Sequence, residues 1–416
     1  MPDDVKFSGD IRQDPPRGPV DAESRIDALP GGDAGLGILS ELSDIDRRRF
    51  LSLAAVPCAA YAAAMCIPAL RALPLSAETA DAVEARFYNK LGSKTVQCGL
   101  CPRQCTVAEG GRGYCGVREN RNGAYYSLVH SRICAAHIDP IEKKPFFHFL
   151  PGTVAFSVAT GGCNVNCKFC QNWEISQARP EELRRQYIRP ADLAAAAKQN
   201  ACPTLAYTYS EPIIASEYYL DSAEAGHQLG IRSVFVSNGF IRREPLNQLC
   251  GRMDAIKIDL KAFSEKYYRE VVNAELRPVM DTMLTIRKHG TWLEVVYLVV
   301  PTLNDSDAEL KDMAKWVRAE LGRDVPIHFS RFYPLYRLRN LPPTPLETLE
   351  RAKAIADAEG LYYVYLGNVP GHPSESTYCP KCRRPVVERT GFTVRQVELK
   401  KGRCPACGQT IAGVWT

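Results

Sequence analysis

Cysteines concentrated in three short groups are the feature that most restricts how this chain can fold. Eleven of its sixteen cysteines fall in these groups, at Cys-x-x-Cys and similarly short spacings. Disulfide frameworks are typical of small secreted domains, whereas such groups in a chain of 416 residues usually bind metal. We therefore expect three regions, each of which brings thiolates together around a metal centre.

The length and composition indicate a globular protein with more than one part. The chain exceeds the ~250–300 residues at which single hydrophobic cores stop growing, so we expect a main domain with appended segments. Hydrophobic residues make up 45% of the chain and charged residues 24%, which is typical of soluble globular proteins. The net charge of +5 permits contact with an anionic partner, but it does not indicate nucleic-acid binding.

The N-terminal 77 residues differ from the rest of the chain. Residues 1–46 are rich in Pro, Gly and Asp and lack periodicity, which predicts a disordered tail. Residues 47–77 begin with three arginines followed by an uncharged Ala-rich run, and so resemble a twin-arginine export signal. Pro57 and Pro68 interrupt the run, which is short of aliphatic residues for a membrane span. An exposed Ala-rich helix is the alternative.

Residues 151–366 show a regular alternation of strand and helix patterns. Helical periodicity covers residues 191–198, 309–321 and 348–359. The runs that favour β-strands are 154–160, 204–209, 233–237, 255–260, 293–300, 327–332 and 362–366. Such alternation predicts parallel βαβ units, and six or seven of them predict an α/β fold that is a partial or full (β/α) barrel. Its active site would lie at the C-terminal ends of the strands.

The central cysteine group directly follows the first of these strands. Cys163, Cys167 and Cys170 are spaced C-x3-C-x2-C, with Phe169 just before the last cysteine. Three thiolates can hold three irons of a [4Fe–4S] cube and leave the fourth iron open. An open position is what a catalytic metal needs. Zinc bound with a distant fourth ligand is the alternative, which the position at a barrel strand's end disfavours.

This loop resembles the signature of the radical S-adenosylmethionine (SAM) superfamily, which is C-x3-C-x-aromatic-C after the first strand. The resemblance implies that the open iron chelates the amino and carboxylate groups of SAM. Reduction of the cluster would then cleave SAM to methionine and a 5′-deoxyadenosyl radical, which abstracts hydrogen from a substrate. It also implies that Phe169 packs near the adenine, and that a low-potential donor resembling flavodoxin or ferredoxin supplies the electron.

Two further strand ends match positions at which this superfamily binds SAM. The second strand ends in Tyr209, Ser210 and Glu211 before a proline, where the family usually has Gly-Gly-Glu-Pro to bind the amino group. The resemblance retains the carboxylate role of Glu211, whereas the replaced glycines put the backbone contacts in doubt. A turn with a solvated Glu is the alternative. Ser237 and Asn238 end the third strand, where the family contacts the sugar or methionine end of SAM.

A charged strand face and a histidine complete the predicted site. Lys257, Asp259 and Lys261 alternate along one strand and so share a face. Neither face of an interior barrel strand readily accepts three charges. The three side chains therefore either line a polar pocket, which we favour, or belong to an edge strand with surface ion pairs. Asp259 and Lys261 also match an Asp-Leu-Lys element of pyruvate formate-lyase activating enzymes. His328 can reach SAM or substrate, although a lone His is more often structural.

The C-terminal cysteine group, within residues 367–416, predicts a zinc-ribbon-like domain. The spacing C-x2-C-x21-C-x2-C gives two knuckles, and four thiolates close the coordination shell of a structural zinc. Rubredoxin-like iron is the alternative. The four residues are Cys379, Cys382, Cys404 and Cys407.

The N-terminal cysteine group lies within a Cys-rich segment of residues 95–150. Its four thiolates could hold a structural zinc, which we slightly favour, or a second [4Fe–4S] cluster. The four residues are Cys98, Cys101, Cys105 and Cys115.

Three longer strings support a closer resemblance. Residues 139–145, 171–177 and 367–372, together with both flanking cysteine groups, look like the AmmeMemoRadiSam-system radical SAM enzymes. That group is similar to pyruvate formate-lyase activating enzymes. The resemblance covers roughly residues 95–416, and it implies the chemistry but not the substrate.

Three classes of function compete at this stage. The leading hypothesis is a radical SAM enzyme, and one version of it is a glycyl-radical activase with a protein substrate. A non-catalytic metalloprotein, either an electron carrier or an adaptor, would explain the flanking groups but not Glu211 or the charged strand. RNA modification is disfavoured because no aromatic and basic platform stands out. SAM and its electron donors are cytoplasmic, so we expect a cytoplasmic or cytoplasm-facing protein tethered by its leader, with export left open.

Overall fold

The computed structural model describes residues 82–416. The expected disordered tail and the twin-arginine-like leader lie outside the described residues. Within the described range, no helix has the length and apolar character that crossing a membrane would require.

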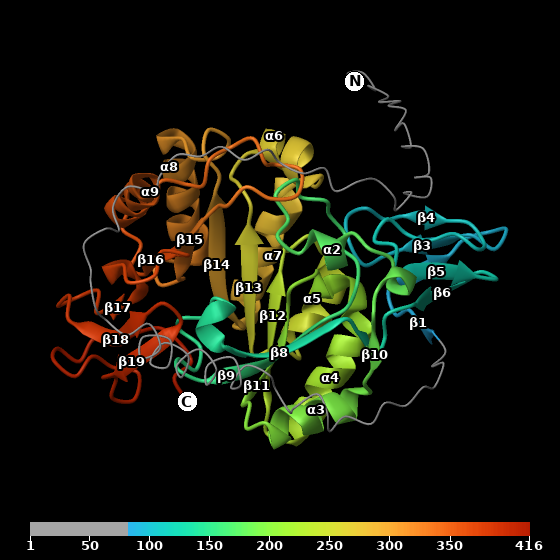
Figure 1. Ribbon diagram of the computed structural model, residues 1–416, viewed down its shortest axis with the longest axis horizontal. Helices are drawn as coiled ribbons and strands as arrows, with labels where there is room; N and C mark the ends of the chain where they lie inside the picture. The colour runs from blue at the N-terminus through green and yellow to red at the C-terminus, as the bar shows by residue number, and fades with distance from the viewer. Residues whose placement is uncertain (1–81) are drawn as a thin grey trace, which may run out of the picture. The chain divides into compact units, whose positions relative to one another are not determined.

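An eight-stranded sheet forms the centre of the described structure, in the order β16-β15-β14-β13-β12-β11-β9-β8. Strands β16 and β8 are the two edges of the sheet and do not pair with each other, so the barrel is partial (Figure 1). Seven strands run parallel, and β8 pairs antiparallel with β9. The strands are β8 (Ala135–Pro140), β9 (Val154–Ala159), β11 (Thr204–Tyr207), β12 (Arg232–Ser237), β13 (Ala255–Leu260), β14 (Trp292–Val299), β15 (Ile327–Arg331) and β16 (Val364–Gly367).

The predicted parallel strands are confirmed to within about two residues at each end. They form because both faces of an interior parallel strand are covered, which requires nearly continuous apolar and β-branched residues. Strand β14 illustrates this, since Leu293, Val295, Tyr297 and Val299 are fully buried. Strand β8 was not predicted, and it belongs to the central sheet although its residues precede the regular alternation.

Six longer helices connect the parallel strands and pack on the sheet (Figure 1). Helix α7 buries Val279, Met283 and Ile286, a spacing that places three side chains on one helix face, and ends at Gly290, whose φ is 78°. Ser306 caps α8 by accepting a hydrogen bond from the Glu309 amide at 3.3 Å. The helices are α3 (Pro190–Gln199), α4 (Ser216–Gln228), α5 (Arg243–Cys250), α7 (Leu276–His289), α8 (Asp307–Trp316) and α9 (Leu346–Ala358).

Short helical turns lie in the connecting loops. They are α2 (Trp173–Ser176), α6 (Glu265–Tyr267) and the 3-10 or π turns Ile141–Lys143, Pro180–Glu182, Pro212–Ala215, Tyr268–Val272, Val317–Leu321 and Pro373–Glu375.

The N-terminal segment folds into small antiparallel sheets beside α4. A buried ion pair between Arg118 and Glu217 joins it to this helix, and the Arg86 amide donates to the same carboxylate at 2.9 Å. The strands are β1 (Val83–Glu84), β2 (Tyr88–Lys90), β3 (Val96–Cys98), β4 (Thr106–Val107), β5 (Arg118–Arg121), β6 (Ala124–Ser127), β7 (Arg132–Ile133) and β10 (Gln186–Tyr187), the last two paired together.

The C-terminal segment forms a three-stranded antiparallel ribbon from β17 (Thr377–Tyr378), β18 (Pro385–Thr390) and β19 (Thr393–Val397). Its small core contains Cys379, Cys404 and Ile411, and it packs on Phe147 and Tyr365 of the main body. The buried Arg389 guanidinium donates to the Phe147 carbonyl at 2.6 Å, which fastens the ribbon to the segment between β8 and β9.

Candidate functional site

The central cysteine loop begins where β9 ends, and two glycines set its path. An added Cβ on Gly162, which has a φ of 96°, would lie 2.8 Å from the Cys115 carbonyl oxygen. An added Cβ on Gly161 would lie 2.6 Å from the Leu183 side chain. Any larger residue would therefore push the loop away from its neighbours.

Hydrogen bonds hold two of the three thiols of this loop in place. The Ser176 hydroxyl lies 3.3 Å from the Cys170 sulfur, and the Val165 amide donates to the Cys163 sulfur at 3.5 Å. Burial raises the pKa of the Cys167 thiol to about 12, although the charge of Lys261 opposes this. A thiolate at this position therefore needs a bound cation, which is what iron would supply.

The spacing of the sulfurs distinguishes this loop from a zinc site. Tetrahedral zinc with Zn–S bonds of about 2.3 Å brings its thiolate sulfurs to about 3.8 Å from one another. Across residues 82–416, the C-terminal cysteines are the group whose ligand atoms all lie within 4.8 Å of one another. The central cysteines do not meet that limit, as expected when each thiolate binds a different iron of a cube. These three residues therefore fit a [4Fe–4S] cluster.

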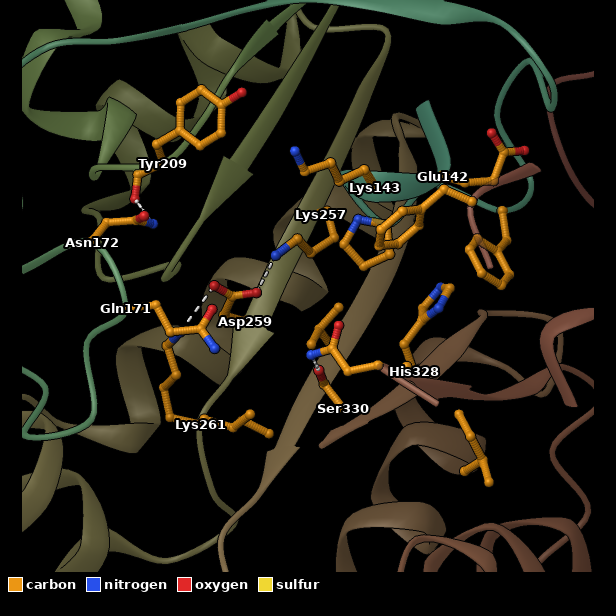
Figure 2. Close-up of a pocket in the computed structure, with 18 of the residues that line it drawn as sticks. Glu142, Lys143, Gln171, Asn172, Tyr209, Lys257, Asp259, Lys261, His328 and Ser330 are labelled. Carbon is orange, nitrogen blue, oxygen red and sulfur yellow. Dashed lines mark hydrogen bonds and ion pairs between the residues drawn. The ribbon is translucent and has the colours of Figure 1, made fainter. Parts of the chain in front are cut away.

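A cavity of about 320 Å³ opens beside the cysteine loop at the C-terminal ends of the strands (Figure 2). Cys167, Phe169 and Cys170 line one side of it, and the charged face of β13 lines another. The remaining walls come from the β8–β9 connection, strands β14 to β16 and the turn between β18 and β19. The barrel therefore has its cavity where the sequence predicts the active site.

The charged strand face lines this cavity, as the sequence analysis favoured. Strand β13 lies between β12 and β14, so the edge-strand alternative is wrong. Lys257 and Lys261 both form ion pairs with Asp259, the second at 2.9 Å (Figure 2). Burial would raise the pKa of Asp259, but the two lysines lower it to about 2. With both lysines protonated the face carries one net positive charge beside the cysteine loop, although burial lowers the pKa of Lys257.

Phe169 is buried beside this face. The Lys261 ammonium lies 5.8 Å from its ring centroid, and the Tyr267 ring lies 6.3 Å away. Its expected packing on adenine stays a prediction.

Glu211 lies near the cysteine loop, but its carboxylate holds the strand ends together. Its oxygens accept hydrogen bonds from the Ser237 hydroxyl and the Asn238 amide, both at 2.8 Å, and from the Ile213 amide at 3.1 Å. Burial raises its pKa to about 7, against these hydrogen bonds, which lower it. Glu211 is absent from the residues that line the cavity in the described structure, and the solvated-turn alternative is wrong because the carboxylate is buried.

The other residues predicted at these strand ends also bond to protein neighbours. The Ser210 hydroxyl donates to the Thr160 carbonyl at 2.5 Å. The Asn238 amide group donates to the Asn164 side chain at 2.8 Å and lies 3.9 Å from the Cys163 sulfur. The sequence therefore identified residues that the fold brings together, and their contacts with SAM stay a prediction.

His328 lines the cavity and is buried at the same time. Its Nε2 lies 2.8 Å from a Glu294 oxygen, and its ring stacks on Tyr365 with centroids 5.0 Å apart. Burial lowers the pKa of His328, although Glu294 opposes this shift. The residue is therefore anchored in the wall, and Ser330 lies beside it (Figure 2).

A cluster around Asp139 escaped sequence reasoning. Its carboxylate forms an ion pair with Lys143 at 2.8 Å, another with Lys144, and a hydrogen bond with Tyr209. Burial lowers the pKa of Lys144 to about 8, although Asp139 opposes this. Lys143 and Tyr209 line the cavity. The available signal was the charged string at residues 139–145, which served only as a mark of resemblance.

The C-terminal cysteines form a compact site for one metal ion. The sulfurs of Cys379 and Cys407 are 3.5 Å apart, and those of Cys382 and Cys404 are 3.6 Å apart. These separations are close to the roughly 3.8 Å of a tetrahedral thiolate site, so the group fits the predicted ribbon metal.

Comparison with known proteins identifies the family. Residues 157–317 match the model of the radical SAM superfamily. The uncharacterized protein MJ0808 of Methanocaldococcus jannaschii is 45% identical over 330 residues, which cover 79% of this chain and 98% of that protein. The pyruvate formate-lyase 1-activating enzyme of Escherichia coli is 22% identical over 229 residues, or 50% of this chain and 91% of the enzyme.

Two solved structures show weaker similarity. A domain of a pyruvate-formate lyase-activating enzyme from Bacteroides vulgatus has a TM-score of 0.35 and 14% identity, with 39% of this chain and 98% of that chain covered. A radical SAM methyltransferase from Sphaerobacter thermophilus has a TM-score of 0.43 and 16% identity, with 53% and 68% covered. On the family model and the sequence relatives, this chain belongs to the radical SAM superfamily and is similar to pyruvate formate-lyase activating enzymes.

Proposed function

We propose that this protein cleaves SAM reductively at a [4Fe–4S] cluster on Cys163, Cys167 and Cys170, and abstracts hydrogen from a substrate held in the adjoining cavity. The observation that carries the proposal is the shared wall: Cys167 and Cys170 line the same cavity as the charged face of β13. When bound, a cluster with one open iron supplies the electron that splits SAM into methionine and a 5′-deoxyadenosyl radical.

The residues around the cavity suit a ligand that carries both a carboxylate and an aromatic ring, as SAM does. Lys257, Asp259 and Lys261 carry one net positive charge in a buried wall, so they favour a carboxylate nearby. Phe169 offers an aromatic face beside the same wall. These side chains would orient SAM and exclude water from it, while Glu211 would keep the ends of β11 and β12 in position.

The other end of the cavity would receive the substrate. Lys143, Tyr209 and His328 supply polar groups there, and Phe392 reaches it from the turn between β18 and β19. Phe392 is 46% exposed, so its ring is free to contact a bound substrate. The ribbon would therefore cover the bound substrate and help to exclude water.

A glycyl-radical activase is one specific form of this function. The similarity to the pyruvate formate-lyase 1-activating enzyme supports it, and it requires a protein substrate. It predicts that a protein partner, rather than a small molecule, accelerates the cleavage of SAM. In either form the electron would come from a low-potential donor of the flavodoxin or ferredoxin type.

The test is the formation of 5′-deoxyadenosine. The protein would be reconstituted anaerobically with iron and sulfide, reduced with dithionite and given SAM. We expect product from the wild type and none from Cys167→Ala. Cys250→Ala is the matched control, because Cys250 is buried at the end of α5, outside the three groups.

A wild-type protein that carries a full cluster but gives no product would contradict the proposal. An electron carrier or adaptor would then be the better explanation, and calorimetry would find no SAM binding. If the protein binds SAM but does not cleave it, the cavity is a SAM-binding site and the proposed radical chemistry is wrong.

A further inference from the structure

The N-terminal cysteine group is built from two neighbouring loops of the small sheets. Cys98 ends β3 and Cys105 precedes β4, and the Cys98 amide donates to the Cys105 carbonyl at 2.9 Å. Cys101 lies on the connection between them, and Cys115 comes from the loop before β5. Cys98 and Cys101 are buried, whereas Cys105 and Cys115 are partly exposed. The group thus has one buried and one outward side.

The sulfurs of this group, like those of the catalytic loop, do not gather as closely as those of the ribbon. Within the described residues, no three of the four ligand atoms meet the 4.8 Å limit that the C-terminal cysteines satisfy. A single zinc ion would require that closeness. A [4Fe–4S] cube does not, because each thiolate binds a different iron. The wider spacing therefore favours a cluster.

Two fully buried polar side chains beside these cysteines lack a hydrogen-bond acceptor. Arg118 uses Nη2 for Glu217 and Nε for the Ile214 carbonyl at 3.3 Å, but its Nη1 has no partner among the described residues. The Tyr125 hydroxyl likewise has none in the described structure. Both side chains are 0% exposed. Native proteins rarely leave such donors unsatisfied, so an acceptor is missing here.

Tyr125 lies beside one of these cysteines, and Arg118 follows Cys115 by three positions in the chain. An added Cβ on Gly113 would lie 2.5 Å from the Tyr125 hydroxyl and 3.9 Å from the Cys105 Cβ, which places this hydroxyl next to Cys105. The sulfides of an iron–sulfur cluster accept hydrogen bonds, as metal-bound thiolates also do, so a cluster on these cysteines would supply acceptors for both donors.

We propose that this group holds a second [4Fe–4S] cluster, with Arg118 and Tyr125 as hydrogen-bond donors to its sulfides. Its four ligands are Cys98, Cys101, Cys105 and Cys115. Arg118 would also balance part of the negative charge that the four thiolates, two of them buried, bring.

The second cluster would lie next to the catalytic loop. Arg103, between Cys101 and Cys105, donates to the Asn164 carbonyl at 2.6 Å, and Asn164 follows Cys163 directly. The Cys115 carbonyl lies against Gly162, where an added Cβ would be 2.8 Å away. The two metal-binding loops are therefore in direct backbone contact.

This contact gives the second cluster a role as an electron relay, an assignment that rests on the proposed function. A reduced flavodoxin- or ferredoxin-like donor would give one electron to the second cluster on its partly exposed side. The second cluster would then pass that electron to the oxidised catalytic cluster and return to its own oxidised state.

The first test removes the catalytic cluster and leaves the second site native. The variant Cys163→Ala/Cys167→Ala/Cys170→Ala would be reconstituted with iron and sulfide and analysed for iron, sulfide and zinc. We expect about four irons and four sulfides per chain, with an electron paramagnetic resonance signal on reduction that SAM does not change. A variant with no iron but about two zinc ions would overturn the proposal.

Two companion variants complete this test. Cys98→Ser/Cys115→Ser should retain about four irons whose resonance signal changes with SAM, and Cys250→Ala should retain about eight. If the double variant fails to fold, the triple variant still decides, because its N-terminal site is unaltered. Iron content does not depend on SAM cleavage, so failure of this proposal is distinct from failure of the proposed function.

The relay is tested by the choice of reductant. Reduced flavodoxin should reduce the catalytic cluster of the wild type, and Cys98→Ser/Cys115→Ser should lose that reduction. Dithionite, a small reductant, should reduce the catalytic cluster of both proteins. Equal reduction of both proteins by flavodoxin would refute the relay.

Discussion

The N-terminal and C-terminal cysteine groups are similar in sequence and different in structure. Both consist of four cysteines at short spacings. The C-terminal sulfurs gather within 4.8 Å of one another, whereas the N-terminal sulfurs do not. Buried donors without a hydrogen-bond partner among the described residues lie beside both groups: Arg118 and Tyr125 at the N-terminal group, and Arg389 at the ribbon. Short cysteine spacing thus predicts a metal, and on the proposal above the separation of the sulfurs distinguishes a single metal ion from a cluster.

Loss of the ribbon metal should have the largest effect. Binding of structural zinc is worth about 10–16 kcal/mol in zinc-finger peptides, and that energy is folding energy. Cys404→Ser should therefore release the metal and unfold the segment after residue 367, while the iron of the N-terminal group is retained. Limited proteolysis and metal analysis would show both results. A ribbon that stays protease-resistant without metal, or one that contains iron, would break the comparison.

The buried arginines beside the two groups offer a matched pair of substitutions. Arg118 pairs with Glu217 and Arg389 pairs with Glu142, and all four side chains are essentially unexposed. Removal of one partner leaves a buried charge unpaired, so Arg118→Leu and Arg389→Leu should each lower the free energy of unfolding by about 3–5 kcal/mol. Urea unfolding measures this loss.

Iron content separates the two arginine variants. Arg118→Leu should also lower the iron bound at the N-terminal group, because it removes a donor and a positive charge. Arg389→Leu should leave iron unchanged. Full iron in Arg118→Leu, or equal iron loss in both variants, would show that Arg118 has no special relation to the cysteines.

Tyr125→Phe should change the free energy of unfolding least, and whether the change is destabilising or stabilising is informative. If the hydroxyl donates to a cluster, its removal should cost about 1 kcal/mol in the iron-loaded protein and be neutral or stabilising in the iron-free protein. Tyr207→Phe is the control, since that hydroxyl lies 3.2 Å from Ser233 and should cost the same in both forms. Chemical denaturation of the two forms makes the comparison. An identical cost for Tyr125→Phe with and without iron would argue against the second cluster.

Much of the central fold could be predicted from the sequence. Interior parallel strands such as β13 and β14 are rich in apolar and β-branched residues, so their composition locates them although each contains charged residues. Lys257, Asp259 and Lys261 could be identified as site residues from the same pattern, because charged side chains on an interior strand require a polar pocket. Strand β8 could not be found in this way, because its residues are half-buried and include His137 and Asp139.

The contacts that depend on distant residues could not be predicted. Asp139 meets Tyr209 across 70 positions of sequence, and Glu211 meets Ser237 across 26. The number of metal ions that each cysteine group binds could not be predicted from the sequence either. Spacing along the chain does not fix the separation of the sulfurs in space. Arg118 and Tyr125 gave no signal at all, because their lack of acceptors is a property of the folded structure.

Central to the proposed function is the direct binding of SAM to an open iron of the cluster on Cys163, Cys167 and Cys170. The most direct measurement is the magnetic coupling between the reduced cluster and SAM labelled with ¹⁵N at its amino nitrogen. We predict that the coupling is present in the wild type and in Cys98→Ser/Cys115→Ser, and absent from Cys167→Ala. A reduced, fully loaded wild-type protein that shows no coupling would contradict the claim.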